Sequence, residues 1–298
     1  ITVTKKEDLW VTTDIGQTSF FKKVGANYKF VNHYLDSLQV IYVFTDREDN
    51  NWFCTRSNGV YFKAAGDLNS TIYNNQSGLH SNEVLSIYID KSNTFWLGFA
   101  DGKIQSFKDN QFKIFDCNFF KRATNRILEI VSDSAGNILA ATDEGIFLIK
   151  KKLNKYSVPK FIRLQDNQDF GKPYYAKSIN ITANNRLYFN CAVRKGFLFP
   201  HGDEYIAKVD TAFLLRKRNF TSLIDSENKR WTSTLIGLVC AENNKEINYA
   251  LKDPWLKQRF TKIVELSDGN LVLGTAGRGL ALFDKKKILS IITVKDKL

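Results

Sequence analysis

Apolar and polar residues follow one another along this chain in a motif that recurs seven times. In its clearest copy an apolar stretch ends at Asp90, a short polar turn follows, and Trp96 stands six residues after the Asp, before a second turn at Gly102. The apolar stretches are short, rich in Val, Ile, Phe and Tyr, and bounded by Asn, Asp, Gly and Ser. This pattern predicts strands joined by tight turns.

The residue in the place of Trp96, which we call the anchor, marks the period of the repeat. The anchors are Trp10, Trp52, Trp96, Leu139, Tyr188, Trp231 and Val272, and their spacings are 42, 44, 43, 49, 43 and 41 residues. A period of about 40–50 residues with strand patterning is typical of a β-propeller with one blade per repeat. We therefore predict an all-β, seven-bladed β-propeller with four-stranded antiparallel blades. Blades bury their faces only against neighbouring blades, so we expect residues 1–298 to form a single propeller domain.

Several details follow from aligning the repeats. We expect Trp52, Trp96 and Trp231 to pack between adjacent blades rather than to stack on a ligand. The step of 49 residues includes the polar stretch 166–171, and it predicts an elongated outer-strand region with a protruding loop. Residues 288–294 predict a last strand that pairs with blade one or blade seven and closes the propeller, which would remove two open sheet edges.

Composition adds limits of other kinds. No run of 18 or more apolar residues occurs, which predicts that this chain has no membrane span. Met is absent and no signal peptide is visible, so we expect a processed protein or a part of a longer one. The four cysteines form no CxxC pair, and Cys54 and Cys191 fall within strand patterns, where a free cysteine is usually a small buried apolar residue.

The net charge of +12 is compatible with nucleic acid, a membrane surface or an acidic ligand as partner. The positive runs at 150–152, 216–218 and 285–287 follow the third strand of a repeat. We interpret them as solvated blade edges that discourage edge-to-edge pairing, with polyanion binding as the alternative. We expect no nucleic acid partner and no membrane contact from this segment.

Catalytic chemistry has no sequence signal. The three histidines, His33, His80 and His201, show no metal-ligand spacing, and no GxSxG, P-loop or GxGxxG motif occurs. We expect no metal, no cofactor and no enzymatic activity. A polysaccharide-acting enzyme stays an alternative, because a pair of carboxylates facing each other across a cleft cannot be recognised from sequence.

A ligand of a propeller is expected at two sets of loops, those that lead into inner strands and those that join strands two and three. Aromatic, Arg and Asn side chains in these loops suit sugars, because a flat ring stacks on the apolar sugar face and polar groups bind the hydroxyls. The candidates are Arg56, Asn58, His80, Asn82, Asp101, Arg122, Asp143, Tyr174, Tyr175, Arg194, Arg216, Trp255 and Arg278. The excess of Arg favours an acidic glycan.

Residues 78–84, together with Ile87, Asp90, the Trp-Leu-Gly of residues 96–98 and Gly102, resemble the two-component regulator propeller repeat, which reads roughly GLPSNxVxxIxxDxxGxLWIGTxxGGL. The resemblance extends over all seven repeats and is weakest in the fifth repeat. His80 stands where this family usually has Pro, and Asn93 where it usually has Gly.

The resemblance implies the periplasmic sensor region of a hybrid histidine kinase of the kind found in Bacteroidetes. Such a region, the extracytoplasmic part of an inner-membrane receptor, binds an extracellular ligand, often an oligosaccharide, and passes the signal through a membrane helix to a kinase or DNA-binding module. Members often carry two propellers in tandem before an immunoglobulin-like domain, so we expect this chain to be a fragment of a larger sensor. A scaffold for protein contacts or homodimerisation is the alternative function.

Overall fold

The computed structural model describes residues 1–13, 15–66, 70–109, 111–153, 155–165, 173–182, 184–192, 194–210, 218–242, 245–296 and 298. They form an all-β, seven-bladed β-propeller with mostly four-stranded antiparallel blades, which confirms the predicted fold class. The chain divides into two compact units, which are described one after the other. Unit one comprises Ile1–Asn118, Arg122–Ile130 and Thr293–Leu298, and unit two comprises Phe119–Lys121 and Val131–Ile292.

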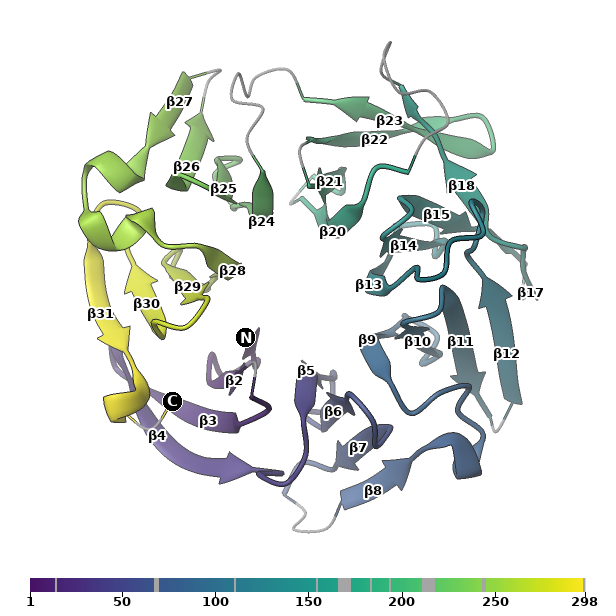
Figure 1. Cartoon of the computed structure of the whole chain (residues 1–298), viewed down its shortest axis with the longest axis horizontal. Helices are drawn as coiled ribbons and strands as arrows, with labels where there is room; N and C mark the ends of the chain where they lie inside the picture. Colours follow the sequence, from purple (N-terminus) through teal and green to yellow (C-terminus); the bar gives the residue numbers. More distant parts are fainter. Residues whose placement is uncertain are drawn as a thin grey trace. The chain divides into compact units, whose positions relative to one another are not determined.

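Unit one contains blades one to three, in which consecutive strands of the chain are neighbours in the sheet (Figure 1). Blade one consists of β1 (Thr2–Val3), β2 (Leu9–Thr12), β3 (Thr18–Val24) and β4 (Asn27–Tyr34). Blade two consists of β5 (Val40–Thr45), β6 (Asn51–Thr55), β7 (Val60–Lys63) and β8 (Ser70–Tyr73). Blade three follows the short helix η1 (Asn75–Ser77) and consists of β9 (Val84–Ile89), β10 (Phe95–Phe99), β11 (Lys103–Lys108) and β12 (Gln111–Asp116).

Unit two contains blades five to seven. Blade five includes β20 (Ala176–Ile181), β21 (Leu187–Cys191), β22 (Lys195–His201) and β23 (Glu204–Val209). Blade six consists of β24 (Asn219–Ile224), β25 (Arg230–Thr234), β26 (Gly237–Glu242) and β27 (Lys245–Asn248), followed by η2 (Tyr249–Leu251) and η3 (Pro254–Lys257). Blade seven consists of β28 (Phe260–Glu265), β29 (Leu271–Thr275), β30 (Leu280–Phe283) and β31 (Ile288–Ile292), and η4 (Val294–Asp296) follows in the sequence.

Blade four is the irregular one. Its strands β14 (Ile138–Thr142), β15 (Ile146–Ile149) and β18 (Lys160–Ile162) lie in unit two, and its inner strand β13 (Ile127–Ser132) spans the boundary between the units. A separate hairpin of β16 (Lys151–Lys152) and β17 (Lys155–Tyr156) precedes β18. The next strand, β19 (Leu164–Gln165), pairs in parallel with β23 and gives blade five a fifth strand. The expected elongated outer-strand region is therefore present, while residues 166–171 lie outside the described residues.

One turn explains why an Asp stands six residues before the anchor. In blade three, Asp90 Oδ1 accepts from the backbone N–H groups of Ser92 at 2.7 Å and Thr94 at 3.0 Å, while Asp90 Oδ2 accepts from Trp96 Nε1 at 3.1 Å. The same indole-to-carboxylate bond joins Trp52 to Asp46 at 2.9 Å and Trp231 to Asp225 at 2.8 Å. Each of these carboxylates connects the turn to the anchor by hydrogen bonds. The buried indole N–H of each Trp anchor therefore has an acceptor.

The third residue after the Asp position has a positive φ in every blade, which explains the preference for Asn and Gly there. In unit one the φ is 62° at Glu7, 62° at Asp49 and 56° at Asn93. Asn93 therefore satisfies the backbone requirement that the family meets with Gly. In unit two the corresponding residues are Gly136, Asn185, Asn228 and Gly269.

The apolar cores lie between neighbouring blades. Trp52 packs with Leu97 and Ile87 of blade three, and Trp231 packs with Leu273 and Phe283 of blade seven. Trp96 and Trp231 are fully buried and Trp52 is almost so, which confirms that these anchors are core residues. All four cysteines are free and buried, as predicted for Cys54 and Cys191.

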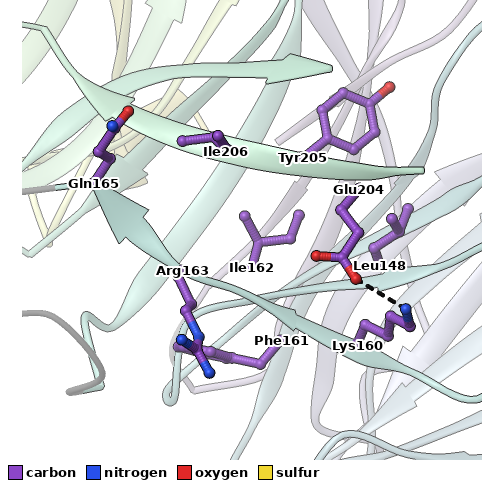
Figure 2. A pocket seen from close by; sticks show the side chains of 9 residues that line it. All are labelled: Leu148, Lys160, Phe161, Ile162, Arg163, Gln165, Glu204, Tyr205 and Ile206. Atoms are coloured by element: carbon purple, nitrogen blue, oxygen red, sulfur yellow. Dashed lines mark hydrogen bonds and ion pairs between the residues drawn. The ribbon is translucent and has the colours of Figure 1, made fainter. Parts of the chain in front are cut away.

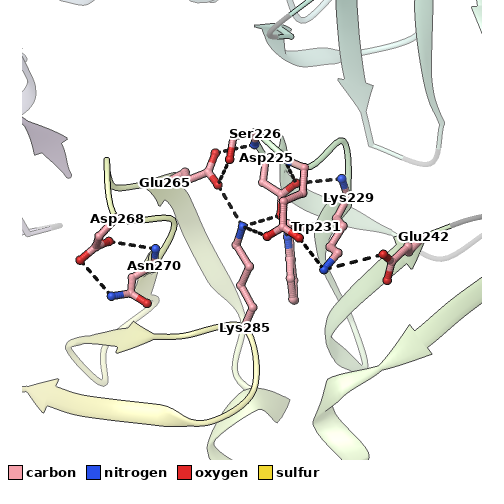
Figure 3. Close-up of polar contacts among 10 residues, drawn as sticks. Asp225, Ser226, Lys229, Trp231, Glu242, Glu265, Asp268, Asn270 and Lys285 are labelled. Carbon is pink, nitrogen blue, oxygen red and sulfur yellow. Dashed lines mark hydrogen bonds and ion pairs between the residues drawn. The ribbon is translucent and has the colours of Figure 1, made fainter.

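Two predictions about the C-terminal region met different outcomes. The last strand pairs with β30 of blade seven, one of the two expected partners, and it ends at Ile292. The interpretation of run 285–287 as a solvated edge was wrong for Lys285. Its Nζ lies 2.9 Å from Asp225 Oδ2 and 3.0 Å from both Glu227 Oε1 and Glu265 Oε1, and its side chain is 10% exposed (Figure 3). Lys285 thus joins blade seven to the turn of blade six.

Candidate functional site

The two predicted sets of loops meet in pairs in each unit. In unit one, Gly59 N–H of the loop after β6 donates to Asn82 O, which precedes β9, at 2.9 Å, and Asp101 forms an isolated parallel bridge with Asn125. In unit two, Asn219 N–H donates to Ala192 O at 2.7 Å. The strand connectivity therefore places each loop beside the segment that leads into the next blade, as expected for propeller loops.

The clearest polar arrangement among the candidates is in blade three. His80 Nε2 lies 2.7 Å from Asp101 Oδ2, and the His80 ring lies 5.2 Å from the ring of Phe99. The His80 backbone N–H donates to Gln105 Oε1 at 2.9 Å, which fixes the loop on the sheet. Both side chains are partly exposed, so His80 and Asp101 are held in place and accessible to a ligand.

The other candidates of unit one flank this pair. Arg56, Asn58 and Arg122 are exposed, whereas Asn82 is half-buried and its Oδ1 accepts from Asn75 N–H at 2.8 Å. We call the set of Arg56, Asn58, His80, Asn82, Asp101 and Arg122 the loop rim of unit one. Asn125 beside it is buried, and its Nδ2 donates to Cys117 O at 2.8 Å, which holds the loop from inside.

The candidates of unit two are in more varied surroundings. Tyr174 is buried: its hydroxyl donates to Ile162 O at 2.7 Å and accepts from Ile146 N–H at 2.9 Å, and burial raises the pKa of this phenol. Trp255 packs against the core of blades six and seven. Tyr175 and Arg278 are exposed, Asp143 and Arg194 are half-buried, and Arg216 lies outside the described residues.

Glu144 is a buried carboxylate that the sequence analysis did not single out. Its Oε2 accepts from the backbone N–H groups of Phe119 at 2.8 Å and Phe120 at 2.9 Å. The side chain is fully buried and therefore fixes a loop rather than faces a ligand. Its position beside Asp143, in a loop between strands two and three, was the only available signal.

A second group missed by sequence reasoning lies between blades five and six. Lys195 Nζ donates to Thr232 Oγ1 at 3.2 Å, and Arg230 Nη1 donates to Asp210 Oδ2 at 2.8 Å. Burial lowers the pKa of Lys195 to about 7, against the opposing effect of the nearby carboxylates of Glu246 and Asp210. This interface is therefore charged, unlike the apolar core between blades one and two.

A pocket of about 250 Å³ lies where β18 and β23 diverge (Figure 2). Lys160 Nζ and Glu204 Oε1 form an ion pair of 2.8 Å across it. Tyr205, on its wall, donates its hydroxyl to Asp133 Oδ2 at 2.8 Å. Both members of the ion pair are well exposed, so this pocket is an open surface groove between β18 and β23.

Among the described residues, no three His, Cys, Asp or Glu side chains are grouped so that they could hold a metal ion. In the same part of the chain, no helix has the length and apolar character needed to cross a membrane.

No family model matches the sequence, and no curated protein matches it significantly. Similar solved structures include virginiamycin B lyase from Staphylococcus aureus with quinupristin, at 13% identity and a TM-score of 0.66, covering 97% of this chain and 92% of that one. YCF48 bound to D1 peptide has 13% identity and a TM-score of 0.62, covering 90% of this chain and 85% of that one. At these identities the similarity shows the fold alone.

A further similar structure is the extracellular domain of a hybrid two component system from B. thetaiotaomicron. It has 15% identity and a TM-score of 0.48, and the match covers 98% of this chain. This chain spans 45% of that domain, less than half of its length.

Proposed function

We propose that this chain is a non-catalytic, extracytoplasmic ligand-binding propeller of a two-component receptor of the hybrid histidine kinase type, and that its ligand is an oligosaccharide. The observation that carries the proposal is the resemblance of the repeat to this family, which is present in all seven repeats and clearest in blade three. The virginiamycin B lyase and YCF48 similarities support the propeller fold on which the proposal depends and say nothing about the ligand.

The loop rim of unit one is the site that we assign to this ligand. It combines the exposed cationic side chains of Arg56 and Arg122 with the paired His80 and Asp101. Sugar hydroxyls need donors and acceptors close together, and His80 and Asp101 offer both within 2.7 Å of each other. The net charge of +12 favours an acidic glycan over a neutral one.

The test is a thermal-shift screen of the 298-residue chain against neutral and acidic oligosaccharides, followed by calorimetry on any hit. A ligand that binds only the folded state raises the melting temperature by mass action. We expect a saturable shift with one glycan class, and about a tenfold loss of affinity in Arg56→Ala and in His80→Ala, which remove charged or polar contacts.

Lys91→Ala is the matched control, because Lys91 is exposed in the turn at the other end of the β9 and β10 strands. It should bind the glycan like the unchanged chain. A complete screen without any shift would count against the oligosaccharide, and equal losses in Lys91→Ala and His80→Ala would remove the assignment to the loop rim.

A protein-binding scaffold is the second candidate. Ile114 is 50% exposed on β12, which is the edge strand of blade three, and an open edge can accept a strand of another chain. The parallel pairing of β19 with β23 is an example of such an addition within this chain. Sedimentation would test it: dimers that Ile114→Lys dissociates, combined with no glycan binding, would favour the scaffold.

A further inference from the structure

We propose that a pocket between blades five and six binds a carboxylate-bearing sugar of the uronate type, with its carboxylate in the place that an Asp of the chain occupies in other blades. The pocket has a volume of about 540 Å³ and is lined by Thr182, Asn184, Arg186, Phe197, Ile224, Asn228 and Arg230. We call it the blade-five pocket. It goes beyond the proposed function, because it is a separate site from the loop rim of unit one.

The first argument is a missing carboxylate. Blades two, three and six have Asp46, Asp90 and Asp225 six residues before the anchor, and blade five has Thr182 there. Its hydroxyl accepts from Arg186 N–H at 3.0 Å, so it replaces the turn bond of the Asp but brings no charge. Residues of blade five therefore leave open a position that is anionic in four other blades, Asp133 of blade four included.

The anchor of blade five lacks the acceptor that the Asp provides elsewhere. Tyr188 is fully buried, and its hydroxyl has no hydrogen-bond partner among the described residues. Its ring lies 4.9 Å from the ring of Phe197, which lines the pocket. Tyr188 does not line the pocket itself, so its hydroxyl marks the departure of blade five from the repeat, and the contact between this anchor and the pocket is made through Phe197.

The second argument is charge. The guanidinium carbon of Arg186 lies 4.0 Å from the ring centroid of Phe197, which holds this side chain against the pocket wall. Arg230 is paired with Asp210, whereas Arg186 makes no ion pair with any residue in the described part of the chain. The pocket thus has one uncompensated cation, and Arg is the side chain best shaped to bind a carboxylate through two parallel bonds.

The third argument is size and polarity. A volume of about 540 Å³ is in the range of small-molecule sites and is larger than an inorganic anion needs. The side-chain amides of Asn184 and Asn228 add donors and acceptors on the same walls. These groups suit the hydroxyls of a sugar acid better than the chain of an apolar acid.

Blade one offers a matched site without this chemistry. A pocket of about 280 Å³ occurs at the corresponding place, where Thr4 also replaces the Asp. Asp8 is in the place of Arg186, Asp49 in the place of Asn228, and Trp10 donates its indole N–H to Asn51 Oδ1 at 2.9 Å. Lys6 and Lys63 on the same walls balance the two aspartates, and the anchor is satisfied, so the blade-one pocket lacks the net positive lining of the blade-five pocket and is an internal control.

The experiment is calorimetry on the 298-residue chain with galacturonate and glucuronate, against galactose and glucose as neutral counterparts. We expect the uronates to bind at least about tenfold more tightly than the neutral sugars, since the charged contact is lost in the latter. Arg186→Gln should weaken uronate binding by about tenfold or more. Thr182→Asp should abolish it by placing a carboxylate of the chain at the site, with an unchanged or higher melting temperature.

Thr4→Asp makes the same substitution in blade one and should leave uronate affinity unchanged. Absence of uronate binding, equal binding of neutral sugars, or unchanged uronate affinity in Arg186→Gln would each overturn the proposal. Competition by sulfate as effective as that of galacturonate would show a simple anion site and overturn the assignment to a sugar. Oligosaccharide binding that His80→Ala removes, together with uronate affinity that Thr182→Asp leaves unchanged, would sustain the proposed function and reject this inference.

Discussion

The contact between blades one and two and the contact between blades five and six use the same positions for opposite chemistry. In the first, Trp10 is surrounded by Phe20, Tyr34 and Phe53, with ring centroids 4.5, 4.9 and 5.1 Å away. In the second, the strand pairing places Tyr188, Phe197, Asp210 and Thr232 at these positions. One backbone pattern therefore accommodates an aromatic cluster in one place and a network of charges in the other.

The difference shows how blade five departs from the repeat. Lys195 occupies the position of Thr18, and Arg230 that of Asn51. A buried ion pair contributes little net stability, because desolvation offsets the attraction between the charges. The charged contact of blades five and six is hence a poor choice for stability alone, which fits a functional role for the adjacent pocket.

Substitution of the anchors Trp10 and Tyr188 should give the largest difference in stability between the two contacts. Trp10→Ala removes the centre of an aromatic cluster, and such substitutions lower the free energy of unfolding by about 3–5 kcal/mol. Tyr188→Phe removes only a hydroxyl that lacks a partner among the described residues, so we expect a change within about 1 kcal/mol. Chemical denaturation of both variants measures the contrast, and similar losses in the two would contradict it.

The charge of Lys195 makes the stability of the contact between blades five and six depend on pH. Its folded-state pKa of about 7 lies below the value near 10.5 of an unfolded chain, so the unfolded state binds more protons between these pH values. This contribution to the free energy of unfolding should rise from pH 7 to pH 8.5, since the cost of burying the charge disappears as Lys195 loses its proton.

Replacement of Lys195 by Met should flatten this rise, and denaturation curves at pH 7.0 and 8.5 test it. The difference between the unchanged chain and Lys195→Met cancels other titrating groups. An identical pH slope in the two proteins would mean that Lys195 is not the group responsible.

Placing an Asp at this position in blades one and five, two of the three blades that lack it, sharpens the comparison further. Thr182→Asp supplies an acceptor for the turn and a negative charge near Arg186 and Arg230, so we expect about 1 kcal/mol of added stability. Thr4→Asp places a carboxylate where Lys6 and Lys63 are already balanced by Asp8 and Asp49 and the indole of Trp10 is already bonded, so we expect no gain. Melting temperatures of both variants test this difference. An equal gain in Thr4→Asp and Thr182→Asp would show that the charges lining the two pockets do not cause it.

The smallest effect is expected at the loop rim of unit one. The contact between His80 and Asp101 is partly exposed, and exposed polar pairs contribute about 0–1 kcal/mol. His80→Ala should therefore keep the free energy of unfolding within about 0.5 kcal/mol while it weakens glycan binding. A large loss of stability would reassign His80 from ligand binding to the structure of the loop.

The sequence alone determined the fold class, the number of blades and the burial of the Trp anchors. These features repeat every 40–50 residues, and a periodic signal survives local exceptions such as Thr182. The Asp and the residue three positions later were also readable, because turn geometry depends on nearby residues only. The same local character explains why the surface loops could be named from sequence as candidates.

Only the tertiary structure decided what lies between blades. The three carboxylates around Lys285 come from two blades, and the charged group around Lys195 joins residues of β22, β25 and β27 with Asp210, which follows β23. Residues this far apart in sequence carry no local signal of their contact, so Lys285 was assigned to a solvated edge and Lys195 was passed over. The blade-five pocket is of the same kind: each residue is ordinary alone, and the missing carboxylate is recognised only when two blades are placed side by side.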